Sequence, residues 1–321
     1  MRLPRAIGGL LAVLLGAGCT AVQPEPRQQP QQEAQQEARH SADGCKGAKL
    51  ESGRHTMRFG GLERVYLLRV PKGRGPHPVL LDLHGLGSTA ARQAAYSRLP
   101  EVGAARGYIV ATPQAAEGRL GWTLPHTYGP DDTAFLAALL DHLEGGLCAD
   151  RGREFAAGMS YGAGMAAALV CGLAGRLAGV APVAGINIVE PCKEAKPTVI
   201  VAFHGDADRI VPYRGGHPFR DASGRLRGLA DMIVLPPVAR VVDGWATVLG
   251  CTKSRNISLS SDVRRSSWRN CAPGAALTLY TIRGGGHTWP GPIAVSSLGA
   301  TTRDLDATRV ILDAFDAAPP R

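Results

Sequence analysis

Short apolar runs alternate with helical segments along most of the chain. Continuous apolar runs bounded by Gly, Pro or polar residues predict buried strands at 65–70, 79–83, 108–111, 155–158, 180–183, 198–203 and 277–282. Amphipathic or small-residue-rich segments predict helices at 133–143, 162–173, 238–249 and 307–315. Strands that alternate with helices in this order form a mostly parallel sheet covered by helices on both faces. We therefore predict a single α/β domain.

One internal segment does not follow this alternation. Residues 214–231 are rich in Gly and Arg and show neither a helical nor a strand period. We predict that they form a long loop over one end of the sheet.

The first 44 residues differ in composition from the rest of the chain. Arg2 and Arg5 precede an apolar stretch, which is typical of a secretory signal peptide and predicts one at residues 1–18. Residues 15–19 read Leu-Gly-Ala-Gly-Cys and resemble a bacterial lipobox, in which the cysteine, here Cys19, is lipidated. The alternative is cleavage near Ala21, which would remove Cys19. Residues 19–44 are rich in Gln and Pro and predict a disordered tether, so the folded domain would span 45–321.

Charge and hydropathy limit the partners of the domain. The chain carries 36 Lys and Arg against 27 Asp and Glu, a formal net charge of +9, and only 5% of its residues are aromatic. The basic residues are spread out and not interleaved with aromatics, so we expect no nucleic-acid partner. After residue 18 no apolar run approaches the roughly 20 residues that span a bilayer. We expect membrane contact through the lipid anchor only, and a location outside the cell or in the cell envelope.

The seven cysteines divide into one plus six. Cys19 belongs to the lipobox, and an even number of cysteines in an exported domain suggests three disulfides, with 15 possible pairings. The six are Cys45, Cys148, Cys171, Cys192, Cys251 and Cys271. Cys251 and Cys271 flank a polar, Ser- and Arg-rich stretch and are predicted to close it, whereas the pairing of the other four stays open. No Cys-x-x-Cys pair or other ligand cluster occurs, so we predict no metal and no cofactor.

A candidate nucleophile lies in a glycine-flanked turn. Residues 158–162 read Gly-Met-Ser-Tyr-Gly, follow a predicted strand and precede a segment rich in Gly and Ala. A sharp turn at this place exposes a hydroxyl at the carboxyl edge of the sheet. We predict that Ser160 is the nucleophile; the alternative is a tight strand-to-helix turn with an incidental serine.

A serine hydroxyl needs a base, and the base needs an acid to orient it. His287 follows three glycines after the last predicted strand and is the predicted base, with a solvated loop histidine as the alternative. Residues 204–213 follow another strand and contain Asp206 and Asp208. We predict Asp208 as the acid and keep Asp206 in reserve, because Asp206 can hold the glycine turn. The order serine, aspartate, histidine is that of the α/β-hydrolases.

Two backbone N–H groups must hold the oxyanion of a tetrahedral intermediate. We predict those of Tyr161, next to the nucleophile, and Leu86, in the His-Gly-Leu-Gly-Ser sequence at residues 84–88. The alternative for that loop is a plain glycine-rich turn. Trp122 and Trp289 are predicted to bind substrate, with core packing as the alternative.

The motifs at 84–88, 158–162, 181–185, 204–213 and 284–291 together resemble the secreted polyhydroxybutyrate depolymerase and feruloyl esterase family. The resemblance covers about residues 45–315 and includes the placement of Cys251 and Cys271. It implies an α/β-hydrolase fold and a Ser-His-Asp carboxylesterase. The implied substrates are phenolic or acetyl esters of plant polysaccharide, or short hydroxyalkanoate polyesters. Residues 161–164, Tyr-Gly-Ala-Gly, depart from the Asn-Gly-Gly of many members, which bears on the acyl preference.

Two other classes of function remain as alternatives. Residues 204–208 also resemble secreted peptidases of the prolyl oligopeptidase type, which usually carry a propeller domain ahead of the hydrolase. A non-catalytic surface-binding lipoprotein is the second alternative, and three intact triad groups argue against it. We expect a monomer whose partner is the ester substrate.

Overall fold

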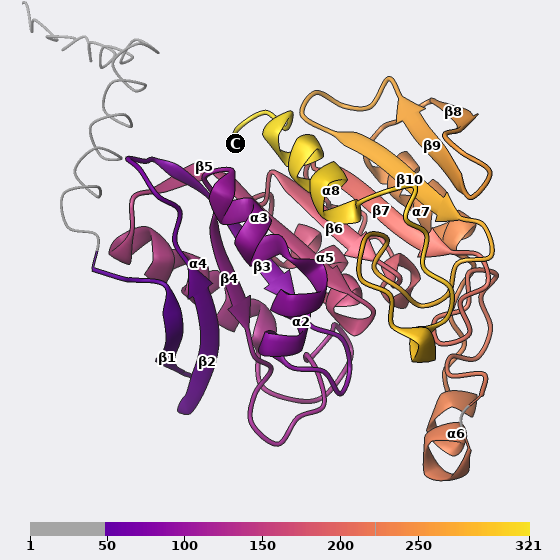
Figure 1. The fold of residues 1–321 in the computed structure, drawn as a ribbon, viewed down its shortest axis with the longest axis horizontal. Coiled ribbons are helices and arrows are strands. Elements are labelled where there is room, and N and C mark those ends of the chain that lie inside the picture. The colour runs from indigo at the N-terminus through magenta and orange to yellow at the C-terminus, as the bar shows by residue number, and fades with distance from the viewer. Residues whose placement is uncertain (1–48, 222) are drawn as a thin grey trace, which may run out of the picture. The chain divides into compact units, whose positions relative to one another are not determined.

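The computed structural model describes residues 49–221 and 223–321, which belong to one compact unit; the predictions for residues 1–44 and for Cys45 lie outside this part. Within the described residues, strands form one sheet in the order β1-β2-β4-β3-β5-β6-β7-β10-β9-β8 (Figure 1). The strands are β1 (Gly53–Phe59), β2 (Leu62–Arg69), β3 (His77–Leu83), β4 (Ile109–Pro113), β5 (Ala149–Met159), β6 (Gly179–Val183), β7 (Val199–Gly205), β8 (Lys253–Ser258), β9 (Val263–Arg269) and β10 (Ala276–Ile282).

The centre of this sheet is parallel. Strands β4, β3, β5, β6, β7 and β10 pair in parallel, whereas β1 and β2 at one edge and β8 and β9 at the other pair antiparallel. All seven residues of β7 are buried, as in a strand that is covered on both faces. The carboxyl ends of the central strands therefore lie along one edge of the sheet.

Helices cover both faces of the sheet. Helices α4 (Asp132–Gly146), α5 (Tyr161–Gly172) and α7 (Val238–Val248) bury their apolar residues in one core cluster. Helices α2 (Ala90–Ser97), α3 (Leu99–Ala105) and α8 (Ala307–Asp316) lie over the opposite face, which is the near face in Figure 1. Short 3₁₀ helices, η2 (Ile186–Ile188) and η3 (Ser296–Leu298), follow β6 and precede α8. In the described part of the chain no helix combines the length and apolarity that crossing a membrane requires.

The predicted α/β architecture is confirmed, and every predicted strand and helix has a counterpart. Strands β1, β8 and β9 were not predicted because they lie at or near the sheet edges and carry many polar residues. The prediction of a loop throughout residues 214–231 is wrong, since α6 (Gly224–Asp231) forms in its second half. The two glycines and two arginines of α6 obscure its helical period.

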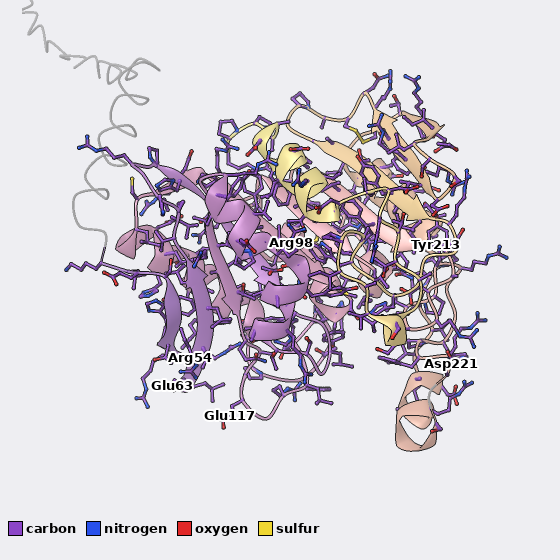
Figure 2. All side chains as sticks on the ribbon, in the orientation of Figure 1. Arg54, Glu63, Arg98, Glu117, Tyr213 and Asp221 are labelled. Carbon is purple, nitrogen blue, oxygen red and sulfur yellow. A yellow bond between two sulfur atoms is a disulfide. The ribbon has the colours of Figure 1, made fainter. Side chains whose placement is uncertain are left out.

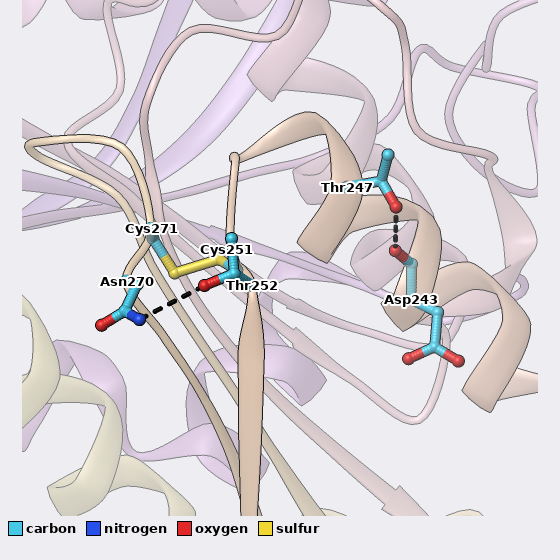
Figure 3. Close-up of a disulfide and its surroundings, with 6 residues drawn as sticks. All are labelled: Asp243, Thr247, Cys251, Thr252, Asn270 and Cys271. Carbon is cyan, nitrogen blue, oxygen red and sulfur yellow. Dashed lines mark hydrogen bonds between the residues drawn. A yellow bond between two sulfur atoms is a disulfide. The ribbon is translucent and has the colours of Figure 1, made fainter.

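The disulfides of the domain agree with the cysteine pattern. Cys251 and Cys271 are bonded, as predicted, and close the hairpin of β8 and β9 (Figure 3). Cys171, at the end of α5, is bonded to Cys192, a pairing that the sequence left open. Cys148 is also disulfide-bonded. Disulfides persist mainly in oxidising compartments, so this bonding fits an exported protein.

Candidate active site

Ser160 stands at a strained turn between β5 and α5. Its backbone has φ 57° and ψ −121°, a conformation that costs a non-glycine residue about 1–3 kcal/mol and persists only where surrounding contacts enforce it. The Ser160 N–H donates to the carbonyl oxygen of Val183 at 2.8 Å. A Cβ on Gly162 would lie 2.1 Å from the carbonyl oxygen of Leu83, so only glycine lets the turn approach β3 this closely. The half-buried Ser160 thus lies at the carboxyl edge of the sheet.

Asp208 and His287 form a buried hydrogen-bonded pair. The imidazole Nδ1 lies 2.8 Å from Asp208 Oδ2, and both side chains are at most 5% exposed. The other carboxylate oxygen, Oδ1, accepts the N–H groups of Ile210 and Val211, both at 2.8 Å. Burial by itself would raise the pKa of Asp208, but hydrogen bonds from His204 and His287 outweigh it and hold that pKa well below the usual range. Asp208 therefore stays ionised and orients the imidazole.

The loop after β7, which carries Asp208, and the loop after β10, which carries His287, lie in close contact. A Cβ on Gly205 would lie 2.2 Å from the carbonyl oxygen of Gly285, so the loop after β7 and the loop after β10 are in direct backbone contact. Asp206 is exposed, and its Oδ1 accepts the N–H of Gly284 at 2.7 Å. The structure thus places Asp208 at the imidazole and uses Asp206, the reserve candidate, to hold the histidine loop.

The loop at residues 84–88 is organised by the buried imidazole of His84. Its Nδ1 lies 2.8 Å from the carbonyl oxygen of Gly85, while its Nε2 accepts the N–H of Ala115 at 3.0 Å and lies 3.1 Å from the side-chain nitrogen of Gln114. Burial lowers the pKa of His84, so the ring is neutral, with Nδ1 as the donor and Nε2 as the acceptor. The indole N–H of Trp122 donates to the His84 carbonyl oxygen at 2.9 Å.

This loop passes beside the nucleophile. A Cβ on Gly85 would lie 3.2 Å from Ser160 Cβ, which places the residue before Leu86 against the serine. A Cβ on Gly121 would lie 2.9 Å from Tyr161 Cδ1 and 3.0 Å from Leu86 Cδ1. Tyr161 adjoins Ser160 in the chain, Leu86 adjoins Gly85, and the side chains of both Tyr161 and Leu86 lie next to Gly121.

The two tryptophans predicted to bind substrate are instead in the core. Trp122 is 1% exposed and stacks at a tilt on His84, with ring centroids 4.9 Å apart. Trp289 is 2% exposed. Its backbone N–H donates to Tyr96 Oη at 3.1 Å, and its indole N–H donates to Thr308 Oγ1 at 3.0 Å. Their prediction as subsite walls is wrong, because both rings are covered and their polar groups are paired within the protein.

Sequence reasoning gave no role to two buried histidines of this region. His84 supports the loop beside the nucleophile, and His204 Nε2 lies 2.9 Å from the carbonyl oxygen of Val211 and 3.5 Å from Asp208 Oδ2. Each follows an apolar run at the end of a strand and precedes a glycine. A polar side chain that interrupts a buried strand at the active edge of the sheet is the signal that could have identified both.

Several proteins with similar sequences are named as esterases. The chain is 29% identical over 263 residues to a protein named "Putative esterase NocK" from Nocardia uniformis subsp. tsuyamanensis, covering 76% of this chain and 74% of that one. It is 29% identical over 223 residues to feruloyl esterase B of Piromyces equi, covering 65% of this chain but only 39% of that protein. No protein-family model matches the chain.

A solved structure supports the same fold. The acetyl xylan esterase of Aspergillus awamori superposes with a TM-score of 0.58 at 15% identity, over 82% of this chain and 99% of that one. The fold is that of the α/β-hydrolases. The resemblance to feruloyl esterases that the motifs predict is confirmed by these relatives.

Proposed function

We propose that this chain is a serine carboxylesterase that uses Ser160, His287 and Asp208 as its triad. The observation that carries the proposal is the convergence of three loops at one edge of the sheet. They present a strained serine, an imidazole held by a buried ionised aspartate, and a loop with backbone N–H groups beside the serine. The similar proteins named above are esterases, which supports the same reaction class.

The proposed reaction has two halves. The Ser160 hydroxyl oxygen attacks the ester carbonyl carbon while His287 takes the hydroxyl proton, and the N–H groups of Tyr161 and Leu86 hold the oxyanion. The tetrahedral intermediate collapses, and His287 gives its proton to the departing alcohol. Water then attacks the acyl-enzyme with His287 again as the base, which releases the acid and restores Ser160.

Replacing the nucleophile tests the proposal. We expect Ser160→Ala to lower kcat for p-nitrophenyl acetate by about 10⁶-fold, the cost of losing a triad serine. Ser261→Ala, at an exposed serine between β8 and β9, is the matched control and should leave kcat unchanged. Unfolding followed by circular dichroism checks that both variants are folded. Activity retained in a folded Ser160→Ala protein would remove Ser160 as the nucleophile.

We propose feruloyl or acetyl esters of plant polysaccharide as the substrates. Support comes from the feruloyl esterase and acetyl xylan esterase among the similar proteins. The test is a side-by-side assay of methyl ferulate, acetylated xylan, short hydroxybutyrate oligomers and a dipeptide amide. A kcat/KM that is highest for the oligomers would assign a polyester substrate, and one highest for the amide would assign the peptidase alternative.

We also propose that the enzyme works outside the cell, anchored through Cys19. The disulfides Cys171–Cys192 and Cys251–Cys271 support export. Metabolic labelling with a radioactive fatty acid in a bacterial host tests the anchor. Label that persists in Cys19→Ser would contradict lipidation at this residue.

A further inference from the structure

A hollow lined by three arginines lies beside the loop that carries His287. Its volume is about 560 Å³, within the range of small-ligand sites. We call it the arginine pocket; its lining residues are Arg98, Gly291, Pro292, Arg303, Asp306 and Arg309. Arg98 stands at the junction of α2 and α3 and is labelled in Figure 2.

The positive charge of the arginine pocket is only partly neutralised. Asp306 is its one acidic lining residue, and its Oδ1 accepts the N–H of Thr308 at the start of α8. Its Oδ2 is shared between Arg98, at 3.3 Å, and Arg309, at 3.6 Å. Arg303 is exposed, and no carboxylate of the described residues forms an ion pair with it. Three guanidinium groups around one carboxylate leave two positive charges uncompensated, which suits an anionic ligand.

The arginine pocket and the predicted catalytic base belong to the same hydrogen-bonded loop. The His287 N–H donates to the carbonyl oxygen of Leu298 at 2.7 Å, and the Gly291 N–H donates to that of Thr302 at 3.1 Å. Gly291 follows His287 by four residues, so their backbones are at most about 14 Å apart. The arginine pocket therefore begins within about 14 Å of the His287 backbone, a distance that an extended oligosaccharide can span.

We propose that the arginine pocket binds the carboxylate of an acidic sugar, a hexuronic acid, carried by the ester substrate. A carboxylate matches the planar fork of a guanidinium group, and Arg303 has its fork free of an ion-pair partner within the described chain. Gly291 and Pro292 add a less polar wall against which a sugar ring can lie. This inference rests on the proposed function, because it places the acidic group on the ester substrate.

A pair of matched substrates tests the proposal. Acetylated xylo-oligosaccharides with and without a glucuronic acid branch differ in one carboxylate. We expect a higher kcat/KM for the branched substrate, with a preference that falls as salt is raised. Arg303→Gln should reduce the preference about threefold to fivefold and Arg303→Glu should reverse it, since an exposed pair contributes modestly. Arg255→Glu, at an exposed arginine of the distant strand β8, is the control and should keep the preference.

A binding measurement separates this proposal from the proposed function. Saturation-transfer NMR with sodium glucuronate and with glucose needs no ester bond, so it reports on the arginine pocket even if the enzyme takes another ester. We expect glucuronate to bind the wild-type protein and Arg255→Glu, and to be lost in Arg303→Glu. Equal signals from glucuronate and glucose, or a substrate preference unaffected by Arg303→Glu, would overturn the proposal. So would binding of inorganic phosphate or of phosphatidylglycerol vesicles without binding of glucuronate.

Discussion

Replacing His84 by phenylalanine should test whether the loop at residues 84–88 must be held in place for catalysis, separately from the triad chemistry. Phenylalanine keeps the ring and its packing against Trp122 but removes both ring nitrogens. The carbonyl of Gly85 and the N–H of Ala115 then lose their imidazole partner inside the protein. The variant thus changes the hydrogen bonds of the loop without deleting a group that contacts the ester.

The size of the effect follows from these contacts. Each buried polar group left without a partner costs about 1–3 kcal/mol, so His84→Phe should lower the free energy of unfolding by about 2–6 kcal/mol. The Leu86 N–H, which we propose holds the oxyanion, lies two residues from His84, so movement of the loop would displace it. Loss of one such donor lowers kcat by about 10²–10³-fold. The loss should appear in kcat more than in KM, because the donor acts in the transition state.

The assay compares kcat for p-nitrophenyl acetate with the free energy of unfolding in urea. His77→Phe is the matched control, because the half-buried His77 also bonds a backbone carbonyl, that of Gly107, at 2.9 Å, and lies at the opposite end of β3. It should cost about 1 kcal/mol of stability and leave kcat unchanged. A folded His84→Phe protein with kcat within about threefold of wild type would refute the role given to His84.

Three predictions concern stability. Burial raises the pKa of Asp82 to about 6, above its unfolded value of 3.8, so the fold is more stable when Asp82 is protonated. About 3 kcal/mol of the free energy of unfolding is therefore lost as pH rises from about 3 to 7. Asp82→Asn should flatten that part of the pH profile measured by urea unfolding. Removing the Cys251–Cys271 disulfide in the double variant Cys251→Ala with Cys271→Ala should lower the free energy of unfolding by about 3 kcal/mol, as measured by thermal unfolding. Adding a reductant should then lower the stability of this variant less than that of the wild type. Arg64→Met should lower the free energy of unfolding in urea by about 3–5 kcal/mol, because it removes the guanidinium 2.7 Å from the buried Asp132 carboxylate. A loss below about 1 kcal/mol would contradict the importance of this ion pair.

Much of the fold could be predicted because its signals are local. The buried central strands are continuous apolar runs, and α7 places its apolar residues on one face. The flanking glycines predict the turn at Ser160, because a Cβ on Gly162 would collide with β3. The edge strands β8 and β9 were missed because exposed antiparallel strands carry polar residues that resemble those of loops.

The sequence by itself determined which residues could do chemistry and the order in which the chain presents them. Only the tertiary structure decided which of them meet. Parallel pairing of β7 with β10 sets Gly205 opposite Ile282, and this register brings Asp208, not Asp206, to His287. Contacts between residues 79 apart depend on strand register and close backbone approach, which no local pattern encodes. The same reason explains why burial of the tryptophans, the support by His84 and the arginine pocket emerged only from the assembled fold.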